Sequence, residues 1–339
     1  MFMTVKSSPL LDFLAATLAD ETLPNTIEQA DFTARFVARG IVQIDPNQRT
    51  SRDIVISCGI HGNETAPIEI CNRLLQRIAR GELAVKQRLL VIFGNPAAML
   101  QQTRFVDENL NRLFCGSHSQ GEQNLERKRA AEIEAAVAAF YVDASRARLH
   151  WDLHTAIRAS AHEKFAVCPY QPERGYRRSV LALLADAGIE AFLFNHAPAY
   201  TFSYHSSKLF NADAFTIELG KVAAFGANDL SRLEKLDVVL SRLIAGEELT
   251  PDADVLKDVT FYQVSRVITK DHDSFDFSFA EATANFTRFS QGELIAKSST
   301  NSVFCDAVTE AIVFPNAKVP VGQRAALCVV PVSIEQVCM

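Results

Sequence analysis

Strand-like and helix-like segments alternate along this chain from Ile54 to Ala245, and this alternation limits the possible fold more than any other feature. The strand-like runs are short and bounded by turn residues, and they cover residues 54–60, 88–94, 150–154 and 215–220. The helix-like segments between and after them cover residues 66–78, 120–141, 177–187 and 230–245. Because such alternation places helices on both faces of one sheet, the pattern predicts an α/β fold with a mixed, largely parallel central sheet.

The character of the chain changes near Phe261. Helical spacing fades, and short alternating runs follow, punctuated by Gly292, Pro315 and Gly322; these runs cover residues 261–268, 275–279, 311–314 and 325–332. Alternation over such short distances is typical of half-buried strands. We therefore expect a larger α/β domain over residues 1–250 and a small all-β C-terminal domain over residues 251–339.

The bulk properties argue against several classes of protein. The 339 residues carry a net charge of −6 without long blocks of like charge, so we expect no nucleic-acid binding. No segment approaches the roughly 18 uninterrupted apolar residues of a membrane span, so we expect no membrane partner. The seven cysteines are odd in number and form no CxxC pair, and no secretory signal is evident, which favours a cytoplasmic protein. Nothing in the sequence excludes a homo-oligomer.

The segment His61-Gly62-Asn63-Glu64 directly follows the first strand-like run. Gly59 and Gly62 predict a turn at the end of that strand, which is where α/β enzymes carry their functional side chains. An imidazole and a carboxylate three residues apart can bind one metal ion. A catalytic zinc ion usually has three protein ligands and one open position, so a third ligand is needed.

His154, at the end of another strand-like run, is the best candidate for that third ligand. Asp152 is an alternative ligand, although an acidic neighbour more often supports a ligating imidazole from behind. Two histidines and one glutamate form the ligand set of carboxypeptidase-type zinc hydrolases. A hydrogen-bonded core histidine is the alternative interpretation of His154.

Glu218 lies inside the apolar run 215–220. A carboxylate in such surroundings is either paired or functional. A metal hydrolase needs a base that takes a proton from water and returns it to the leaving group, and Glu218 suits this role. The alternative is a buried structural ion pair.

Arg104 and Arg112 lie in a loop with interleaved asparagine and acidic residues that follows the strand-like run 88–94. Guanidinium groups bind carboxylates through paired, charge-assisted hydrogen bonds, so the loop is a candidate carboxylate-binding element. Either arginine could instead tie the loop together through Asp107 or Glu108.

Five motifs occur in an order that resembles the succinylglutamate desuccinylase/aspartoacylase family, a branch of the zinc carboxypeptidase-like hydrolases. They are residues 59–64, 95–96, 109–112, 152–154 and 217–220. The resemblance implies a zinc carboxypeptidase-like fold and an amidohydrolase activity. It also implies that His61, Glu64 and His154 bind one Zn²⁺ per subunit and that Glu218 is the general base.

The same resemblance implies which side chains bind the substrate. Arg104, Asn111 and Arg112 match the family's carboxylate-binding residues. Tyr204 and Lys208 stand where the aspartoacylase branch has a tyrosine and an arginine that contact substrate. Because lysine cannot reproduce the planar fork of arginine, Lys208 argues against the aspartoacylase branch.

The resemblance further implies a small dicarboxylic N-acyl amino acid as substrate. Residues 218–222 and 314–325 favour the branch that cleaves N-succinyl-L-glutamate to succinate and glutamate in arginine catabolism. Two alternatives stay open: hydrolysis of N-acetylaspartate or another N-acyl amino acid, and a non-catalytic protein that binds a metal or ligand on the same scaffold. The other histidines, at positions 118, 150, 162, 196, 205 and 272, are expected at the surface.

Overall fold

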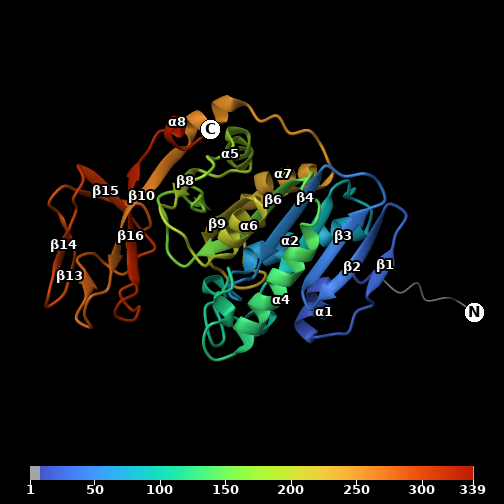
Figure 1. Ribbon diagram of the computed structural model, residues 1–339, viewed down its shortest axis with the longest axis horizontal. Coiled ribbons are helices and arrows are strands. Elements are labelled where there is room, and N and C mark those ends of the chain that lie inside the picture. Colours follow the sequence, from blue (N-terminus) through green and yellow to red (C-terminus); the bar gives the residue numbers. More distant parts are fainter. Residues whose placement is uncertain (1–7, 339) are drawn as a thin grey trace, which may run out of the picture.

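The computed structural model describes residues 8–338, and a single 13-stranded sheet runs through most of them (Figure 1). Its strands are β1 (Thr26–Glu28), β2 (Phe32–Ala38), β3 (Ile41–Pro46), β4 (Arg52–Cys58), β5 (Arg88–Phe93), β6 (Ala147–Ala156), β7 (Lys164–Cys168), β8 (Ala191–Phe194), β9 (Asp213–Lys221), β10 (Thr260–Thr269), β12 (Thr287–Ser290), β15 (Thr309–Val313) and β16 (Arg324–Pro331). Their order across the sheet is β1-β2-β3-β5-β4-β6-β9-β7-β8-β10-β16-β15-β12. A second, three-stranded sheet contains β11 (Asp276–Phe277), β13 (Leu294–Lys297) and β14 (Ser302–Phe304).

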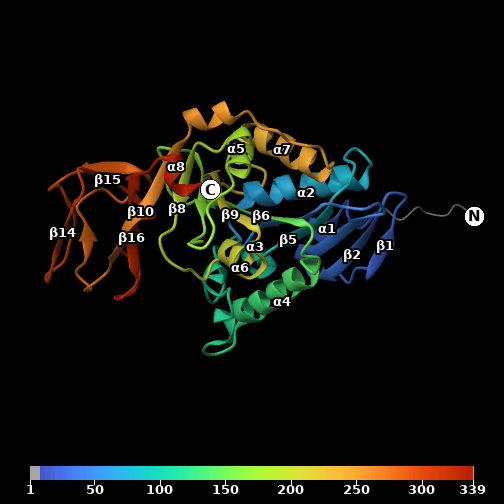
Figure 2. The ribbon, with the colours of Figure 1, turned by 45° about the horizontal axis from the view of Figure 1, so that its top comes forward.

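Helices cover both faces of the larger sheet (Figure 2). They are α1 (Phe13–Ala19), α2 (Thr65–Ala79), α3 (Pro96–Gln101), α4 (Leu125–Phe140), α5 (Arg178–Asp186), α6 (Phe202–Phe210), α7 (Glu234–Ile244) and α8 (Ile334–Val337). Short 3₁₀ turns are η1 (Leu110–Arg112), η2 (Ser117–Ser119), η3 (Leu230–Leu233) and η4 (Ala253–Asp258). In the part of the chain that the structure describes, we find no helix long and apolar enough to cross a membrane.

The four strands at the centre of the sheet, β5, β4, β6 and β9, run parallel to one another. Antiparallel pairs flank them, β3 with β5 on one side and β7 with β9 on the other. The predicted α/β fold with a mixed, largely parallel central sheet is therefore confirmed. Parallel strands end at the same edge, so the carboxyl ends of β4, β6 and β9 lie side by side.

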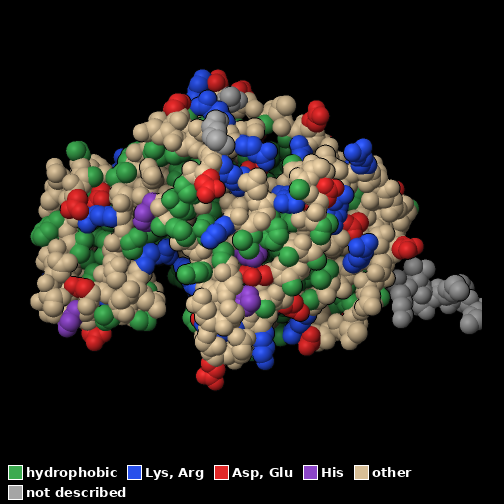
Figure 3. Space-filling model, in the orientation of Figure 1, with side chains coloured by type: hydrophobic (Ala, Val, Ile, Leu, Met, Phe, Trp, Pro, Cys, Tyr) green, Lys and Arg blue, Asp and Glu red, His purple; other side chains and the backbone are tan. Residues whose placement is uncertain are grey.

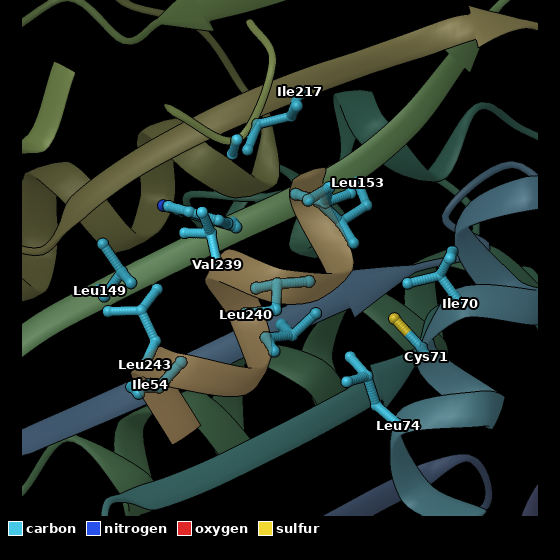
Figure 4. Packing of buried hydrophobic residues seen from close by; sticks show 14 of the residues in the cluster. Ile54, Ile70, Cys71, Leu74, Leu149, Leu153, Ile217, Val239, Leu240 and Leu243 are labelled. Atoms are coloured by element: carbon cyan, nitrogen blue, oxygen red, sulfur yellow. The ribbon is translucent and has the colours of Figure 1, made fainter. Parts of the chain in front are cut away.

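One face of this central sheet packs against α2, α5 and α7 (Figures 2 and 4). Successive side chains of a strand point to opposite faces, and the apolar residues Leu149, Trp151 and Leu153 of β6 belong to this core. Figure 4 shows Leu240 and Leu243 of α7 packed over the strands. Burial of this apolar face holds α2, α5 and α7 on the sheet.

The opposite face carries α4 and α6 (Figure 2). Ile133 and Val137 of α4 pack there against Val55 and Ile92. Nearer to the carboxyl ends of the strands this face is polar, because the residues of β6 that alternate with the apolar ones are His150, Asp152 and His154. The candidate site lies at this polar end.

The predicted helix over 120–141 begins only at Leu125. Gly121 adopts a φ of +89°, and the Asn124 side chain accepts a hydrogen bond from the Arg127 backbone N–H at 2.8 Å, so Asn124 caps the helix. The predicted helix over 230–245 likewise divides into η3 and α7. Strands β1–β3, β7, β8 and β12–β14 were not predicted.

The C-terminal region is rich in antiparallel β-strands, as expected, and it continues the large sheet because β10 pairs in parallel with β8. Residues on both sides of this junction share a core in which Phe165 and Leu193 pack with Tyr262, Val264 and Phe286. A division at residue 250 would fall between α7 and η4, and we retain that domain boundary as a proposal.

Candidate metal centre

Three side chains from two strand ends meet at the polar end of the sheet. His61 and Glu64 lie in the turn after β4, and His154 lies in β6. One possible ligand atom of each lies within 4.8 Å of the others, and all three residues are at most 3% exposed. The structure therefore brings together the three residues that the sequence suggested as metal ligands.

Two glycines shape the turn that carries His61. Gly59 adopts a φ of +64°, a conformation that side chains disfavour. A Cβ atom on Gly62 would lie 2.1 Å from the backbone carbon of Ala98 in α3, so only glycine lets the turn pack against that helix. Glycine at position 62 is therefore required by packing, while the histidine and glutamate on either side of it supply the candidate metal ligands.

The Glu64 carboxylate lies between the two imidazoles. Its Oε1 is 2.8 Å from Nδ1 of His61, and its Oε2 is 2.8 Å from Nδ1 of His154. The backbone N–H of Thr155 also donates to Oε2 at 3.1 Å. Both Nδ1 atoms consequently face the same carboxylate.

The other ring nitrogens are held from outside the cluster. Nε2 of His154 is 2.9 Å from Oδ2 of Asp152, and Nε2 of His61 is 3.0 Å from Oδ1 of Asn109. Such outer hydrogen bonds orient ligating histidines in metal proteins. Asp152 thus occupies the supporting position behind His154, while Asn109 was not recognised from the sequence as a partner of His61.

The surroundings of His61 fit a cation. Burial lowers the pKa of His61 to about 4, so near neutral pH its ring carries one N–H. Asn109 Oδ1 accepts a hydrogen bond from the Asn111 backbone N–H, so this oxygen can only accept from Nε2 of His61 as well. One N–H cannot serve Asn109 and Glu64 together, so a ring nitrogen faces an oxygen with no proton between them. A shared metal ion satisfies that pair, and the cluster fits one.

The electrostatics of Glu64 and His154 differ from those of His61. Burial opposes the charged form of both groups, yet the two histidines hold the pKa of Glu64 well below its usual value. The carboxylates of Asp152 and Glu64 in turn raise the pKa of His154 well above its usual value.

Glu218 lies in β9 opposite His154 in the register between the two strands. Its side chain is buried, and among the described residues its Oε2 has no hydrogen-bond partner. Burial, followed by the charge of Glu64, raises the pKa of Glu218 to about 7 despite the opposing charges of His154 and Arg104. A buried carboxylate that is half protonated near neutral pH can both take up and release a proton.

Behind Asp152 a chain of polar side chains runs into the protein. The Ser57 hydroxyl donates to Asp152 Oδ1 at 2.6 Å and lies 2.8 Å from Nε2 of His150, whose Nδ1 is 2.8 Å from the Ser206 hydroxyl. The expectation of a surface position is therefore wrong for His150, and also for His205, which is 2% exposed. The alternation of His150, Asp152 and His154 along β6 was the signal for a shared buried face.

The loop after α3 reaches the metal cluster through Arg104, whose Nη1 donates to Glu64 Oε1 at 2.8 Å. Among residues 8–338, Arg104 and Arg112 make no ion pair with Asp107 or Glu108; Glu108 instead pairs with Arg127 of α4 at 2.8 Å. The alternative in which these arginines only tie the loop through its own acidic residues is wrong.

Arg112 donates to the carbonyl oxygen of Asn111 at 2.7 Å and forms no ion pair with a described residue. Desolvation of the Arg112 guanidinium by surrounding protein atoms lowers its pKa to about 10, and the positive charges of Arg324 and Arg104 add to this shift. Arg324 begins β16, so a basic side chain of the C-terminal region acts on the loop. Figure 3 shows a hollow between the C-terminal strands and the rest of the molecule, with Lys and Arg side chains at its upper end.

Asn111 and α6 are linked, since Asn111 Oδ1 accepts from the Phe202 backbone N–H at 2.9 Å. Tyr204 and Lys208 also lie on α6, one turn apart, and the Lys208 ammonium is 5.6 Å from the centre of the Tyr204 ring. Within the described chain, neither side chain hydrogen-bonds to the metal cluster. The structure thus brings Arg104 to the cluster and pairs Tyr204 with Lys208.

Comparison with known proteins gives two domain matches in sequence order. Residues 50–244 match the succinylglutamate desuccinylase/aspartoacylase catalytic domain, and residues 257–332 match the AstE/AspA barrel-sandwich hybrid domain. A curated protein named succinylglutamate desuccinylase from Shewanella frigidimarina is 48% identical over 336 residues, which is 96% of this chain and 97% of that protein. A protein of the same name from Shewanella denitrificans is 47% identical and covers 88% of each chain.

Solved structures show the same likeness. A succinylglutamate desuccinylase from Vibrio parahaemolyticus superposes with a TM-score of 0.87 at 38% identity over 95% of both chains. The one from Chromobacterium violaceum gives the same TM-score and identity over 95% of this chain and 98% of that one. Murine aminoacylase 3, at 16% identity and a TM-score of 0.58, covers 84% of this chain and 97% of its own, and it shares the fold.

Proposed function

This chain belongs to the succinylglutamate desuccinylase/aspartoacylase family, and we propose that it is a zinc-dependent amidohydrolase that cleaves N-succinyl-L-glutamate to succinate and L-glutamate. The names and near full-length identity of its relatives support the substrate. The observation that carries the reaction type is the buried carboxylate of Glu218, which lies opposite His154 of the metal cluster and whose Oε2 has no hydrogen-bond partner among residues 8–338.

His61, Glu64 and His154 would hold the metal ion. Two imidazoles and one carboxylate are the donor set of catalytic zinc sites in carboxypeptidase-type hydrolases. Zinc bound there supplies Lewis acidity, which polarises a carbonyl group and makes water more acidic. Asp152 and Asn109 would keep the two rings in their ligating orientation.

Glu218 would move the proton during hydrolysis. Its pKa of about 7 suits a group that accepts a proton from the attacking water and then delivers it to the amide nitrogen of the departing glutamate. The scissile C–N bond breaks as that nitrogen is protonated, and the succinyl carbonyl carbon gains the hydroxyl group.

Basic and amide side chains around the cluster would bind the carboxylates of the substrate. Arg104 uses Nη1 for Glu64 and keeps its other guanidinium N–H groups for a substrate carboxylate. Arg112 has no carboxylate partner among the described residues, and Asn111 lies beside it. We retain Tyr204 and Lys208 as further substrate-binding residues on the family resemblance alone.

We also propose a cytoplasmic role in arginine catabolism, in which a succinylated glutamate is the compound to be cleaved. The substrate is small and anionic, and nothing in this proposal involves nucleic acid or a membrane. A homo-oligomer is compatible with it.

Replacement of Glu218 by glutamine tests the proposed chemistry. We expect Glu218→Gln to keep about one zinc ion per chain and to lower kcat for N-succinyl-L-glutamate by about a thousandfold, because a glutamine cannot transfer the proton. Glu82→Gln, at an exposed position, is the control and should match the parent. Zinc is measured by elemental analysis and turnover by release of succinate.

Three results would contradict the proposal in different ways. Unchanged turnover in the zinc-loaded variant would remove Glu218 from the mechanism. Full turnover by a parent protein freed of zinc would exclude the metal. A zinc-loaded parent that binds N-acyl amino acids without cleaving them would favour the non-catalytic alternative.

A further inference from the structure

Glu126 is a fully buried carboxylate, with 0% of its surface exposed, that the proposed reaction does not use. It lies in the first turn of α4, and its side chain points at the loop that carries Arg104. Oε1 accepts from the Val106 backbone N–H at 2.7 Å, and Oε2 accepts from the backbone N–H groups of Asp107 at 3.2 Å and Glu108 at 3.4 Å. Three successive amides of one loop thus converge on one carboxylate.

A fourth hydrogen bond joins this carboxylate to the end of β5. The Asn95 side-chain amide donates to Glu126 Oε1 at 3.0 Å, and Asn95 Oδ1 accepts from the Ala98 backbone N–H at 3.1 Å, which caps α3. Glu126 therefore connects α4, the start of α3 and the loop. Without an acceptor at this position, the amides of residues 106–108 would be left without their partner.

The acidic side chains of the loop also bond to residues at the start of α4. Glu108 pairs with Arg127 at 2.8 Å and accepts from the Asn124 amide at 3.1 Å, while Asp107 accepts from the Leu125 backbone N–H at 3.4 Å. The acidic residues of the loop are therefore used by α4 and not by the arginines of the loop.

The same loop contacts the metal cluster on both sides of this anchored stretch. Before it, the Arg104 carbonyl oxygen accepts from the Gly62 backbone N–H at 3.2 Å, and the Arg104 guanidinium donates to Glu64 at 2.8 Å. After it, Asn109 Oδ1 lies 3.0 Å from Nε2 of His61. The segment that Glu126 holds is the one that spaces Arg104 from Asn109.

We propose that Glu126 is a positioning residue that fixes residues 104–109, so that Arg104 and Asn109 reach Glu64 and His61 in the geometry that binds substrate. It acts through the loop and does not touch the reacting atoms. Its effect on kinetics rests on the function proposed above, whereas its effect on the loop does not.

The first test measures the loop alone. Glu126→Gln keeps the shape of the side chain and one acceptor oxygen. Its NH₂ group must face either the amides of Asp107 and Glu108 or those of Val106 and the Asn95 side chain, so at least one loop amide loses its acceptor. In the metal-loaded full-length protein, we expect amide hydrogen exchange at residues 106–108 to accelerate about tenfold. Glu132→Gln is the matched control, because Glu132 lies on the same helix at the surface and, within the described part of the chain, forms an ion pair with Arg129 alone. In this control, exchange at residues 106–108 should stay at the parent rate.

The second test asks whether Glu126 acts through Arg104. With N-succinyl-L-glutamate we expect Glu126→Gln to raise KM about tenfold and to change kcat less than about threefold. In an Arg104→Ala background the same substitution should change KM less than about twofold, because Arg104 is the substrate-binding side chain of the two that Glu126 positions. A general loss of stability would give equal factors in both backgrounds.

The outcomes separate this inference from the function. Unchanged exchange at residues 106–108, or equal KM factors in the two backgrounds, would overturn the positioning role. An inactive parent protein would overturn the function while the exchange experiment still decides the role of Glu126. If Glu126→Gln does not fold, Glu126→Asp provides the variant, since it keeps the charge but is too short to reach all three amides.

Discussion

At the scale of single residues, His150 shows how a polar side chain is accommodated in the buried face of the sheet. It is 0% exposed and lies between the hydroxyl groups of Ser57 and Ser206, each 2.8 Å from a ring nitrogen. Burial lowers its pKa to about 4; the charge of Asp152 opposes this shift, and those of His205 and His154 add to it. The folded protein therefore keeps His150 neutral at a pH where the unfolded chain protonates it.

This difference predicts a loss of stability in acid. A histidine in the unfolded chain has a pKa of about 6.5, so below that pH the unfolded state binds the extra proton and stability falls until pH about 4. At pH 5 the loss due to His150 amounts to about 2 kcal/mol. We expect urea unfolding in the presence of EDTA to show that His150→Gln loses less stability than the parent between pH 7 and pH 5. If the free energies of unfolding of the two proteins fall in parallel with pH, the pKa of His150 is not lowered by folding.

The candidate metal ligands and Glu218 could be proposed from the sequence because their types and their places in strand-like runs are local properties. His61 and Glu64 follow an apolar run, His154 ends a strand-like run, and Glu218 lies inside an apolar run. The partners of these residues could not be predicted in the same way. Asn109 reaches His61 across 48 positions and Glu126 reaches Val106 across 20, and such contacts depend on how the loop packs against α4.

At the scale of elements, β6 and α6 explain why a polar face can be buried. Along β6, apolar residues alternate with His150, Asp152 and His154, and α6 supplies a hydroxyl group where His150 points. Ser206 meets His150, and Ser203 lies 2.7 Å from the Thr216 hydroxyl of β9. The buried side chains of His150, Asp152 and Ser203 thus each have a partner from a neighbouring element.

The hydroxyl of Ser57 is predicted to support the metal site through Asp152. Ser57→Ala removes the 2.6 Å hydrogen bond to Asp152, so His154 loses part of its outer support and zinc affinity should fall about tenfold. Ser203→Ala removes a comparable buried hydroxyl bond at a position away from Asp152 and is the control. Competition with a chelator measures affinity. Equal affinities in the two variants would show that Ser57 only fills space.

Element types were predicted well where the apolar spacing was regular, and less well at boundaries. The helix expected from residue 120 starts at Leu125 because Asn124 caps it, a feature of side-chain bonding and not of spacing. Strands β1–β3 pair in antiparallel order at the edge of the sheet, and β2 alternates buried and exposed residues over only part of its length. Weak alternation of this kind carries little signal in a single sequence.

At the scale of the whole molecule, the continuous sheet brings the C-terminal region close to the metal site. β10 joins β8 in parallel, and the loop after β6 is tied to the C-terminal strands because Arg158 donates to the carbonyl oxygen of Pro315 at 3.0 Å. Asn316 then donates to the Ala325 carbonyl beside Arg324 at 2.8 Å. Arg324 is therefore carried toward the loop that holds Arg112.

Removal of the Arg324 guanidinium tests whether the C-terminal region takes part in binding. Arg324→Ala should raise KM for N-succinyl-L-glutamate about fivefold, since a positive charge near Arg112 attracts the anionic substrate. Arg288→Ala changes an exposed arginine of the same region and should leave KM unchanged. Steady-state kinetics in low salt provides the measurement. An equal KM for both variants and the parent would place the binding site wholly within the larger α/β part.

The most direct test of the central claim compares kcat/KM of the zinc-loaded protein for N-succinyl-L-glutamate and N-acetyl-L-aspartate under identical conditions. The account predicts a preference for N-succinyl-L-glutamate of at least about a hundredfold. N-acetyl-L-aspartate lacks the terminal carboxylate of the succinyl group, and groups placed to bind that carboxylate discriminate strongly against a substrate without it. Equal values, or a preference for N-acetyl-L-aspartate, would contradict the assignment as a desuccinylase while leaving the zinc hydrolase in place.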